Sequence, residues 1–344
     1  MATLKLASFN VENLFSRAKI LNLQSKQLTE QLLDKVAELN TLLAKDPYST
    51  ADKTAIKKLL GELKDYIILR EDRSKLLTGR GSKARVTAKG ASAWDGGIEF
   101  KRDTFSDTTR GNTAQVIKDV NADVCCVVEA EDRISLNRFN SALLDSKKFK
   151  QVMCIDGNDD RGIDVGIMTN HAIVGLRSHI YDGTSRSRTF SRDCLHVELD
   201  LGGGKTLHVL CNHLKSKMGG DSPASKAKRT KQAERIVEIL GQFDLKTDLV
   251  AVMGDMNDTP DSTPLAPLMA VSNLHDVLEL AFGNDMARRW TYNYRGKKDQ
   301  IDFILVSKPL KDAWQASGVE RNGMIGVGLI PASDHGAVWA TFNL

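Results

Sequence analysis

Polar and ionisable side chains stand at positions where short apolar segments of this sequence begin or end. They are Asn10, Glu12, Glu129, Asn212, His213, Asp255, Asn257, Asp302, Asp334 and His335. A single Asp or Asn beside a strand is usually a turn former or a cap. In α/β proteins, however, ligands bind at the ends of strands. Because six separate segment ends carry carboxylate, amide or imidazole groups, the pattern favours one shared pocket over six unrelated turns.

The types of these residues restrict the chemistry of such a pocket. Carboxylate and amide oxygens without cysteine favour a hard cation, Mg²⁺ or Mn²⁺, over zinc, and histidines exchange protons near neutral pH. The sequence contains neither a G-x-x-x-x-G-K-[ST] phosphate loop nor the G-x-S-x-G and H-E-x-x-H motifs. We therefore expect metal-assisted hydrolysis of a phosphate ester.

Short apolar segments predict the strands that would position these side chains. The segments are Leu4–Phe9, Val124–Val128, Val165–Thr169, Leu195–Leu199, Leu207–Cys211, Leu249–Met253, Ile301–Val306 and Ala337–Phe342. Several are apolar at consecutive positions, as is typical of strands covered on both faces. Helical stretches lie between them, notably Thr113–Val120 and Ala224–Leu240. The prediction is an α/β sandwich whose strand-rich part is discontinuous in sequence.

Residues 16–109 have a different pattern, in which two apolar stripes recur at helical spacing. The first stripe consists of Leu28, Leu32, Val36, Leu39 and Leu43, and the second of Ile56, Leu59, Leu60, Leu63 and Ile67. Asp46–Thr50 between them carries stop and N-cap signals. We expect a helical hairpin inserted after the first strand. Its stripes favour core packing over a dimerising coiled coil, because only a few heptads are present.

The insertion is also the basic part of the chain. Residues 16–110 carry 19 Lys and Arg against 13 Asp and Glu, an excess of six, whereas the whole chain has a net charge of +4. No acid lies between Asp72 and Asp95, where six bases fall: Arg73, Lys75, Arg80, Lys83, Arg85 and Lys89. A flexible basic arm would contact a nucleic-acid backbone, with Arg80, Lys83, Arg85 and Lys89 as the contacts. A solvated surface loop is an equal alternative.

Bulk composition places the chain among globular proteins, with 41% hydrophobic and 27% charged residues. No apolar run reaches the about 20 residues of a membrane-spanning helix. The N-terminus lacks the basic and apolar regions of a signal peptide, so we expect a cytoplasmic protein without membrane contact. The five cysteines form no C-x-x-C pair and lie in or beside apolar runs. This layout favours buried free thiols over zinc ligation or disulfides.

Seven short motifs follow one another along the chain. They are Ser8–Asn13, Val128-Glu129, Arg161–Gly166, Asn212–Ser216, Gly254–Asp258, Asp299–Asp302 and Ser333–His335. In this order they resemble the motifs of the endonuclease/exonuclease/phosphatase superfamily, which includes deoxyribonuclease I-like and exonuclease III-like enzymes. The resemblance implies a four-layer α/β/β/α sandwich of two packed mixed sheets. The catalytic domain would comprise residues 1–15 and 110–344, interrupted by the basic helical insertion 16–109.

The resemblance also implies roles at the metal and at the attacking water. The metal ligands would be Glu129, as the principal carboxylate, with Asn10, Asp334 and Glu12. Asp255 and Asn257 match the pair that positions the water and the phosphate. His335 resembles the imidazole at the scissile phosphate, with Asp302 as the carboxylate that orients it.

A second group of matches points to the deoxyribonuclease branch. His213 matches a second imidazole, and Asp164 falls where that branch has its acidic partner. Such a partner would raise the pKa of His213, so that the protonated ring could donate to the leaving alkoxide. Arg192, Asn212 and Lys215 are expected to bind the phosphate or the substrate.

Together these features predict a Mg²⁺-dependent nuclease that hydrolyses DNA or RNA by in-line attack of water. One alternative is a phosphodiesterase or phosphatase for a small molecule or lipid head group. Another is a binding module that has lost catalysis, which is disfavoured because every expected catalytic position is filled. The insertion begins just beyond Asn10, so it is expected near the rim of the pocket. There it would govern substrate choice, and it could also mediate protein contacts.

Some residues match no motif. His171, His179, His196, His208 and His275 are interpreted as ordinary surface or core positions. Trp290, Tyr292 and Tyr294 could stack on bases, but aromatic residues this close to a strand more often belong to the core.

Overall fold

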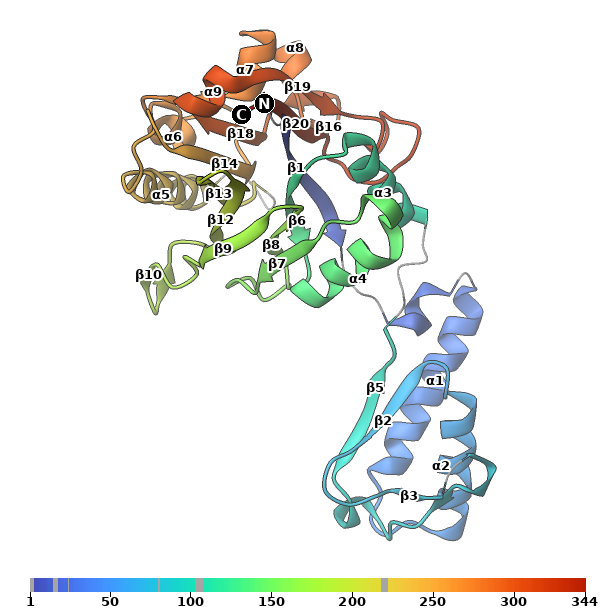
Figure 1. The fold of residues 1–344 in the computed structure, drawn as a ribbon. Coiled ribbons are helices and arrows are strands. Elements are labelled where there is room, and N and C mark those ends of the chain that lie inside the picture. Colours follow the sequence, from blue (N-terminus) through green and yellow to red (C-terminus); the bar gives the residue numbers. More distant parts are fainter. Residues whose placement is uncertain (1–2, 15–17, 24, 80, 103–107, 218–221) are drawn as a thin grey trace. The chain divides into compact units, whose positions relative to one another are not determined.

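The chain forms two compact units in a computed structural model (Figure 1). The structure describes residues 3–14, 18–23, 25–79, 81–102, 108–217 and 222–344. The first unit comprises Met1–Phe15 with Phe105–Leu344, and the second comprises Ser16–Thr104. The first unit therefore holds every strand-end residue singled out above, and the second is the insertion.

The first unit contains two six-stranded mixed sheets. One sheet has the order β19 (Trp314–Glu320), β20 (Ala337–Asn343), β1 (Thr3–Leu14), β6 (Val124–Ala130), β8 (Asp164–Thr169) and β7 (Gln151–Ile155). The other has the order β15 (Leu274–Asp276), β18 (Asp302–Ser307), β14 (Leu249–Asp255), β13 (Lys205–His213), β12 (Cys194–Gly202) and β9 (Ala172–Arg177). The small pairs β10 (Gly183–Thr184) with β11 (Ser187–Arg188) and β16 (Tyr292–Tyr294) with β17 (Lys297–Asp299) lie outside both sheets.

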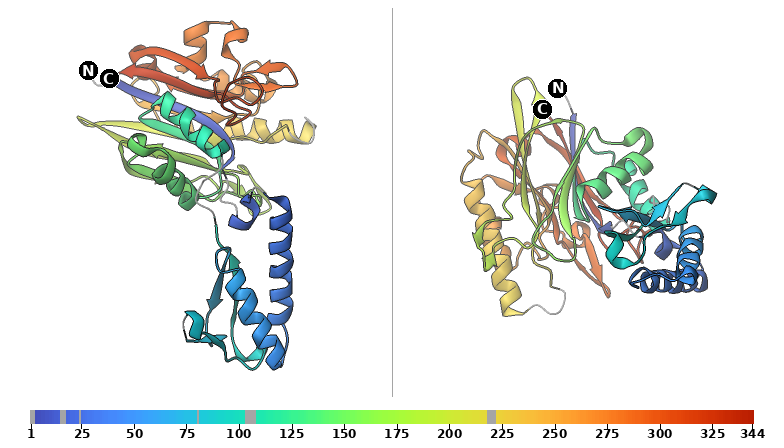
Figure 2. Two further views of the ribbon diagram at one scale, coloured as in Figure 1. Left: turned by 90° about the vertical axis from the view of Figure 1, so that its right-hand side faces the viewer. Right: turned by 90° about the horizontal axis from the view of Figure 1, so that it is seen from below.

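Helices cover the outer faces of both sheets (Figure 2). The apolar faces of α3 (Thr108–Val120) and α4 (Arg133–Leu143) pack on β1 and β6, and those of α5 (Pro223–Leu240) and α6 (Ala266–Met269) pack on β13, β14 and β18. Three further helices are α7 (Val277–Phe282), α8 (Met286–Arg289) and α9 (Lys308–Ala313). The expected four-layer α/β/β/α sandwich is therefore confirmed.

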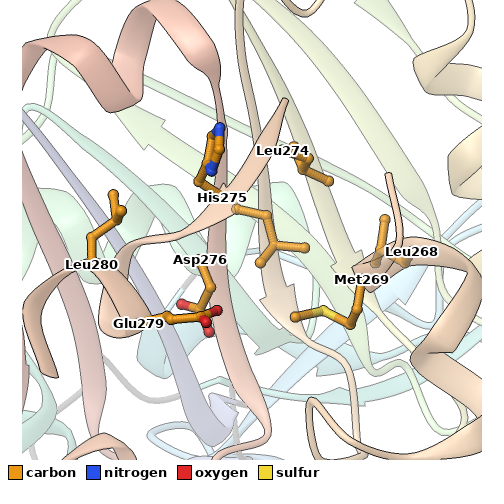
Figure 3. Close-up of a pocket in the computed structure, with 8 residues that line it drawn as sticks. Leu268, Met269, Leu274, His275, Asp276, Glu279 and Leu280 are labelled. Carbon is orange, nitrogen blue, oxygen red and sulfur yellow. The ribbon is translucent and has the colours of Figure 1, made fainter. Parts of the chain in front are cut away.

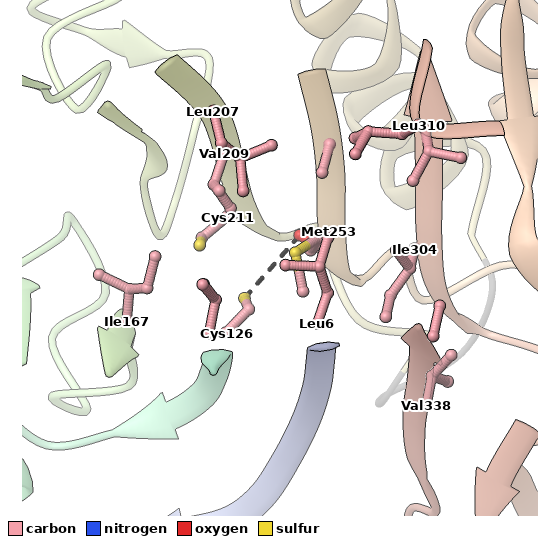
Figure 4. Packing of buried hydrophobic residues seen from close by; sticks show 14 of the residues in the cluster. Leu6, Cys126, Ile167, Leu207, Val209, Cys211, Met253, Ile304, Leu310 and Val338 are labelled. Carbon is pink, nitrogen blue, oxygen red and sulfur yellow. Dashed lines mark hydrogen bonds between the residues drawn. The ribbon is translucent and has the colours of Figure 1, made fainter. Parts of the chain in front are cut away.

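The core between the sheets explains the uninterrupted apolar runs of the central strands. Along β13, Leu207, Val209 and Cys211 point into the core shared by the two sheets, whereas Leu210 packs among the helices (Figure 4). Each central strand is thus buried on both faces, and its side chains need no polar alternation. All five cysteines are buried and free, as the sequence predicts. Within the described residues, no helix is both long and apolar enough to cross a membrane.

The predicted central strands and helices all occur within a few residues of their expected bounds. The strands that the sequence does not reveal are mainly those at the sheet edges, β7, β9, β15 and β19. These strands are short or have partly exposed side chains. Their apolar signal is therefore too weak to stand out from the surrounding loops.

The second unit contains the two expected helices, α1 (Lys26–Leu43) and α2 (Thr50–Glu62), and Ser49 caps α2 in a capping box with Asp52. It is more than a helical hairpin, because β2 (Ile67–Glu71) pairs with β5 (Gly96–Phe100) and β3 (Leu77–Thr78) pairs with β4 (Arg85–Val86). Ile67, expected on the second helix, begins β2 instead. Apart from the exposed Leu28, the helical stripes pack into one core with residues from these strands and loops.

The basic stretch between Asp72 and Asp95 is not a free arm where the structure describes it. Leu76, Ala88 and Trp94 from this stretch are buried in the core of the second unit. The expectation of a flexible arm is therefore wrong, because three apolar side chains anchor it. Lys83, Arg85 and Lys89 are exposed, and Arg80 lies outside the described residues.

Two buried aromatic side chains link the helices to this stretch. The Trp94 indole donates to the Tyr48 hydroxyl at 2.9 Å, and Tyr48 donates to the carbonyl oxygen of Leu43 at 2.7 Å. Tyr48→Phe leaves both the indole N–H and a helix-end carbonyl without this hydroxyl. We expect a loss of about 1–3 kcal/mol in local stability, measured by hydrogen–deuterium exchange of α1 and α2.

Tyr66→Phe is the matched control, because the half-buried Tyr66 hydroxyl makes no side-chain hydrogen bond within the described residues. Equal exchange rates in the two variants would contradict the structural role of Tyr48.

Candidate active site

Two site carboxylates owe their direction to irregularities at strand ends. The pairing of β1 with β6 shifts register between Asn10 and Leu14, and that of β6 with β8 shifts between Val128 and Ala130. At these irregularities Glu12 and Glu129 have positive φ values of 50° and 70°. Bulges of this kind turn a side chain away from its regular face and are common beside active sites. Asn257, with φ of 52°, has the same left-handed backbone.

Gly254 allows the second sheet to present Asp255. Its φ is +136°, and a Cβ atom there would lie 1.9 Å from the carbonyl oxygen of Asn212 on the adjacent β13. No side chain can therefore be accommodated at this position. The parallel pairing of β13 with β14 then places His213 beside Asp255, and the pairing of β14 with β18 places Asp255 beside Asp302.

Asp255 lies at the centre of the site. Its Oδ1 accepts a hydrogen bond from the backbone N–H of Asn257 at 2.7 Å. Its Oδ2 accepts from the amides of Asn10 at 3.1 Å and Asn257 at 3.2 Å. Burial, reinforced by the nearby Asp302 carboxylate, raises the pKa of Asp255 to about 7.

His335 is held by a carboxylate as expected. Its Nδ1 lies 2.8 Å from Oδ2 of Asp302, and its backbone N–H donates to Ser333, whose hydroxyl donates to the carbonyl oxygen of Asn10. Burial alone would lower the pKa of His335, but the carboxylates of Asp302, Asp255 and Asp334 outweigh it and raise the pKa to about 10. At neutral pH the ring is an imidazolium.

His213 differs from the expectation drawn from the resemblance. Its Nδ1 is buried without a hydrogen-bond partner among the described residues. Asp164, its expected partner, instead accepts from the backbone N–H of Gly157 at 2.7 Å. Burial and the positive charge of Arg192 hold the pKa of His213 well below its usual value. The expectation of a raised pKa is therefore wrong: no carboxylate pairs with Nδ1, and the charge of Asp159 does not offset the effect of burial.

The charged groups converge at separations that leave room for another group. Nε2 of His213 lies 3.7 Å from Oδ2 of Asp255 and 3.8 Å from Oε1 of Glu129. Nε2 of His335 lies 4.0 Å from the same Asp255 oxygen and 3.7 Å from Asp334. These distances exceed those of direct hydrogen bonds. An oxygen of water or phosphate that lies to one side of these atoms could be within hydrogen-bond distance of several of them.

The carboxylates of Glu12, Glu129 and Asp334 are near enough for their charges to interact, although their ligand atoms do not all lie within 4.8 Å of one another. Burial raises the pKa of Glu12 and Glu129, and the Asp334 carboxylate adds to the rise in both. Like charges therefore repel one another here, and an oxygen-only donor set fits a hard divalent cation. Asp255, Asp302 and His335 also lie within 4.8 Å of one another. Nδ1 of His335 is engaged by Asp302, so Nε2 is the ring nitrogen that faces Asp255 and Asp334.

Arg192 supplies positive charge at the same place. It is almost fully buried, pairs with Asp159 at 3.0 Å, and donates to the carbonyl oxygen of Leu214 at 3.4 Å. Asn257 donates to that same carbonyl at 3.1 Å, so Leu214 joins the arginine to the Asp255 network. Arg192 is therefore fixed before any substrate arrives.

The other residues expected to bind the substrate, Asn212 and Lys215, make hydrogen bonds within the protein. Asn212 is buried and donates to the carbonyl oxygen of Leu210 at 2.9 Å. The backbone of Lys215 donates to the buried Gln232. Partial burial and the charges of Arg192 and Arg161 lower the pKa of the Lys215 ammonium. Lys215 thus belongs to a basic rim beside the site.

The sequence did not identify three residues at the site. Asp159 holds Arg192, and Arg161 in turn forms an ion pair with Asp159 and contributes positive charge near Glu129. Tyr292 lies against His335, with ring centroids 4.8 Å apart. Arg161 stands in one of the seven motifs, so that motif was a signal by which the sequence could have identified it. Nothing in the sequence indicated that Tyr292 would contact His335.

A separate pocket of about 240 Å³ lies away from these groups. Leu268, Leu274, His275, Asp276 and Glu279 are among its lining residues (Figure 3). The Asp276 carboxylate accepts hydrogen bonds from Arg289 at 2.8 Å and from Gln300 at 2.7 Å. This pocket shares no residue with the strand-end site.

The Asp302–His335 pair gives a direct test of the site's electrostatics. Asp302→Asn should lower the pKa of His335 by about 1–3 units in metal-free protein, because the nearest opposite charge is removed. Titration of the imidazole by NMR measures this shift. In the wild type the pKa of His335 is raised from its ordinary value of about 6.5 to about 10. The pair therefore contributes its full stabilisation of the fold below about pH 6.5, and this contribution is lost as pH rises through about 10.

Asp299→Asn is the matched control, since that carboxylate pairs with Lys297 instead. A His335 pKa that moved equally in both variants would refute the specific pairing.

Comparison with known proteins bears on the family and the fold of this chain. The model of the endonuclease/exonuclease/phosphatase family matches residues 90–323, and no curated protein matches the chain. Truncated Caenorhabditis elegans TDP2 is 22% identical, with 69% of this chain and 91% of that chain covered and a TM-score of 0.52. Humanized D. rerio TDP2 with 14 mutations is 15% identical, with 99% of both chains covered and a TM-score of 0.53.

D. rerio TDP2 complexed with single strand DNA product is 17% identical, with 70% of this chain and 94% of that chain covered and a TM-score of 0.52. At such identities the structural likeness bears on the fold alone, and it agrees with the two packed sheets. The family model spans more than half of the chain. The chain belongs to the endonuclease/exonuclease/phosphatase family.

Proposed function

We propose that this protein is a divalent-metal-dependent nuclease that hydrolyses phosphodiester bonds of DNA or RNA. The observation that carries the proposal is the convergence of His213 and His335 on one oxygen of Asp255, at 3.7 and 4.0 Å. The two imidazoles have pKa values shifted in opposite directions, and an oxygen of the substrate could contact both of them near this carboxylate. The family membership supports phosphoester chemistry at this place.

Asp255 is the proposed base. A carboxylate with a pKa near 7 can accept a proton from water at neutral pH. The amide groups of Asn10 and Asn257 fix its orientation. As the water oxygen bonds to phosphorus, the ester P–O bond breaks, and the leaving oxygen can take a proton from the His335 imidazolium. Negative charge grows meanwhile on the non-bridging phosphate oxygens.

The positive groups stabilise that charge. His335 as an imidazolium and the pre-positioned Arg192 offset the negative charge that grows on the phosphate oxygens. His213 as a neutral imidazole contributes a hydrogen bond and no net charge. This division of roles replaces the one implied by the resemblance, in which His213 was the protonated acid.

Glu12, Glu129 and Asp334, with Asn10 beside them, would hold Mg²⁺ or Mn²⁺. When bound, the cation supplies further neutralisation of the phosphate and so lowers the barrier to attack. Without it the three carboxylates would repel an anionic substrate.

A nucleic acid is the favoured substrate for two reasons. One structural relative is a TDP2 complexed with single strand DNA product. Lys215 and Arg161 form a basic rim at the site, and Tyr294, which is 56% exposed, stacks on Tyr292 beside His335. Such an aromatic pair offers a surface on which a base can stack. A small phosphodiester or lipid head group would use neither feature fully.

Replacing the proposed base tests the mechanism. Asp255→Asn keeps the shape of the side chain but removes its basicity, so we expect turnover to fall by about 10²–10⁴-fold. His335→Ala and His213→Ala should each lower turnover without unfolding the protein. Plasmid nicking and degradation of single-stranded DNA and RNA, with Mg²⁺ and with EDTA, measure the effect. Thermal unfolding verifies the fold of each variant.

His171→Ala is the matched control, because this half-exposed histidine lies at the start of β9 and outside the site. Hydrolysis of bis(p-nitrophenyl) phosphate with intact nucleic acid would favour the small-molecule alternative. Metal-dependent binding of DNA without any turnover would favour a binding module. Wild-type rates in Asp255→Asn would overturn the site assignment altogether.

The exposed bases of the second unit are proposed to contact the phosphate backbone. Neutralising Lys83, Arg85 and Lys89 together with Gln should weaken binding and flatten its dependence on salt. On single strands, the slope of log K against log salt should fall by about 0.7 for each phosphate that is no longer neutralised. Fluorescence anisotropy on a catalytically inactive Asp255→Asn background measures it.

A triple change of Lys147, Lys148 and Lys150 to Gln is the matched control. These lysines are equally exposed but precede β7, at the opposite end of its strand pairing from Asp164. If both triple variants change the slope alike, the second unit has no special contact with the backbone.

A further inference from the structure

A second group of metal-ligating side chains lies on the outer face of the second sheet. His196 and Glu198 are on β12 and His208 is on the neighbouring β13, where it pairs directly with Glu198. Residues 195, 197, 207 and 209 fill the core between the sheets. The alternating positions 196, 198 and 208 therefore share the opposite face. The strand geometry alone brings these three side chains together.

The ligand atoms of the three residues are within metal-binding reach of one another. One atom from each lies within 4.8 Å of the other two. Nε2 of His196 and Nδ1 of His208 are 3.1 Å apart. Two nitrogens bound to a tetrahedral zinc at about 2.0–2.1 Å are about 3.3 Å from each other. A cation could therefore bind both nitrogens at nearly their present separation, once the rings turn their lone pairs toward it.

The surroundings favour ligation. Phe243 packs against both rings, with centroids 5.5 Å from His196 and 4.8 Å from His208, and so fixes their orientation. Burial and the neighbouring His208 lower the pKa of His196 to about 4, so that its ring is neutral at physiological pH. A neutral imidazole is the form that binds a metal.

Glu198 supplies the negative ligand. Its carboxylate lies over Gly175 of β9, where a Cβ atom would come within 2.7 Å of it. It makes no side-chain hydrogen bond or ion pair within the described residues. Both Glu198 and His208 are half-buried, so solvent can reach the group. Three protein ligands with solvent access leave a fourth position for water.

We propose that His196, Glu198 and His208 form a binding site for a first-row divalent transition cation such as Zn²⁺. Two imidazoles and one carboxylate suit zinc, copper or nickel, whereas Mg²⁺ prefers oxygen ligands alone. The site is separate from the strand-end site, because His208 and His213 are five residues apart on β13, or about 16 Å. It is independent of the nuclease proposal.

The cation would join β12 to β13 next to the edge strand β9. A bound ion that contacts only the folded chain raises the apparent stability of that chain. A bound cation would therefore stabilise the part of the second sheet next to β9, at the edge opposite β15.

Cobalt binding tests the proposal in the full chain. Metal-stripped protein in excess Mg²⁺, which fills the oxygen site, is titrated with Co²⁺ and followed by visible absorption. We expect one Co²⁺ with the intense bands of tetrahedral coordination, displaced by Zn²⁺. His208→Gln retains a hydrogen-bonding partner for His196 but should weaken binding at least about 10-fold. Glu198→Gln, a second variant that conserves shape, should do the same.

His171→Gln and Asp255→Asn are the controls. Both should bind Co²⁺ as the wild type does, and nucleic-acid hydrolysis with Mg²⁺ should be unchanged in His208→Gln. Wild-type absorption in His208→Gln and Glu198→Gln would overturn the proposal. Loss of the bands in Asp255→Asn alone would place the cation in the strand-end site and would overturn it equally.

Discussion

The concentration of carboxylates at one end of the sandwich is the constraint on which the active site depends. Asp255 and Asp302 are buried, and the charges of Glu12, Glu129 and Asp334 interact nearby. Removing two carboxylates from water beside further acidic groups is unfavourable unless other groups compensate. The protein compensates with a protonated His335, with amide donors from Asn10 and Asn257, and with the buried Arg192. The remaining negative charge is the feature that suits the proposed divalent cation.

This constraint also explains the unusual backbone of the site. Glu12, Glu129 and Asn257 all have positive φ, and Gly254 permits an approach that no other residue could make. Regular strands would send alternate side chains to opposite faces. Irregular strand ends let consecutive elements of both sheets direct their polar groups to one point. The regular part of each sheet then provides the rigid support that keeps these groups in place.

The sequence was sufficient for the central fold because burial on both faces leaves a strong local signal. Runs such as Val124–Val128 are apolar without interruption, and β6 follows from them directly. Edge strands such as β9 alternate between partly buried and exposed residues, and the sequence alone does not separate them from loops. The strands of the second unit were missed for a related reason, since β3 and β4 have only two residues each.

The site was predictable as a set of residues but not as a set of charge states. Strand ends and motif order identified Asp255, His335 and Glu129 because those signals are local. The protonation of His213 depends on its burial and on Arg192, which come together only in three dimensions. The same holds for His196 and His208, which the sequence treats as unrelated residues and which the strand register places 3.1 Å apart.

The position of the second unit in the chain has a consequence for folding order. β1 pairs in parallel with β6, and Leu6 lies opposite Val124, so all of Ser16–Thr104 is synthesised between two partners of the same sheet. Closing such a long loop as an unstructured chain costs entropy that grows with its length. The second unit has its own core, and if it folds as it leaves the ribosome it shortens the effective loop. Its early folding would then set the rate at which the first sheet can close.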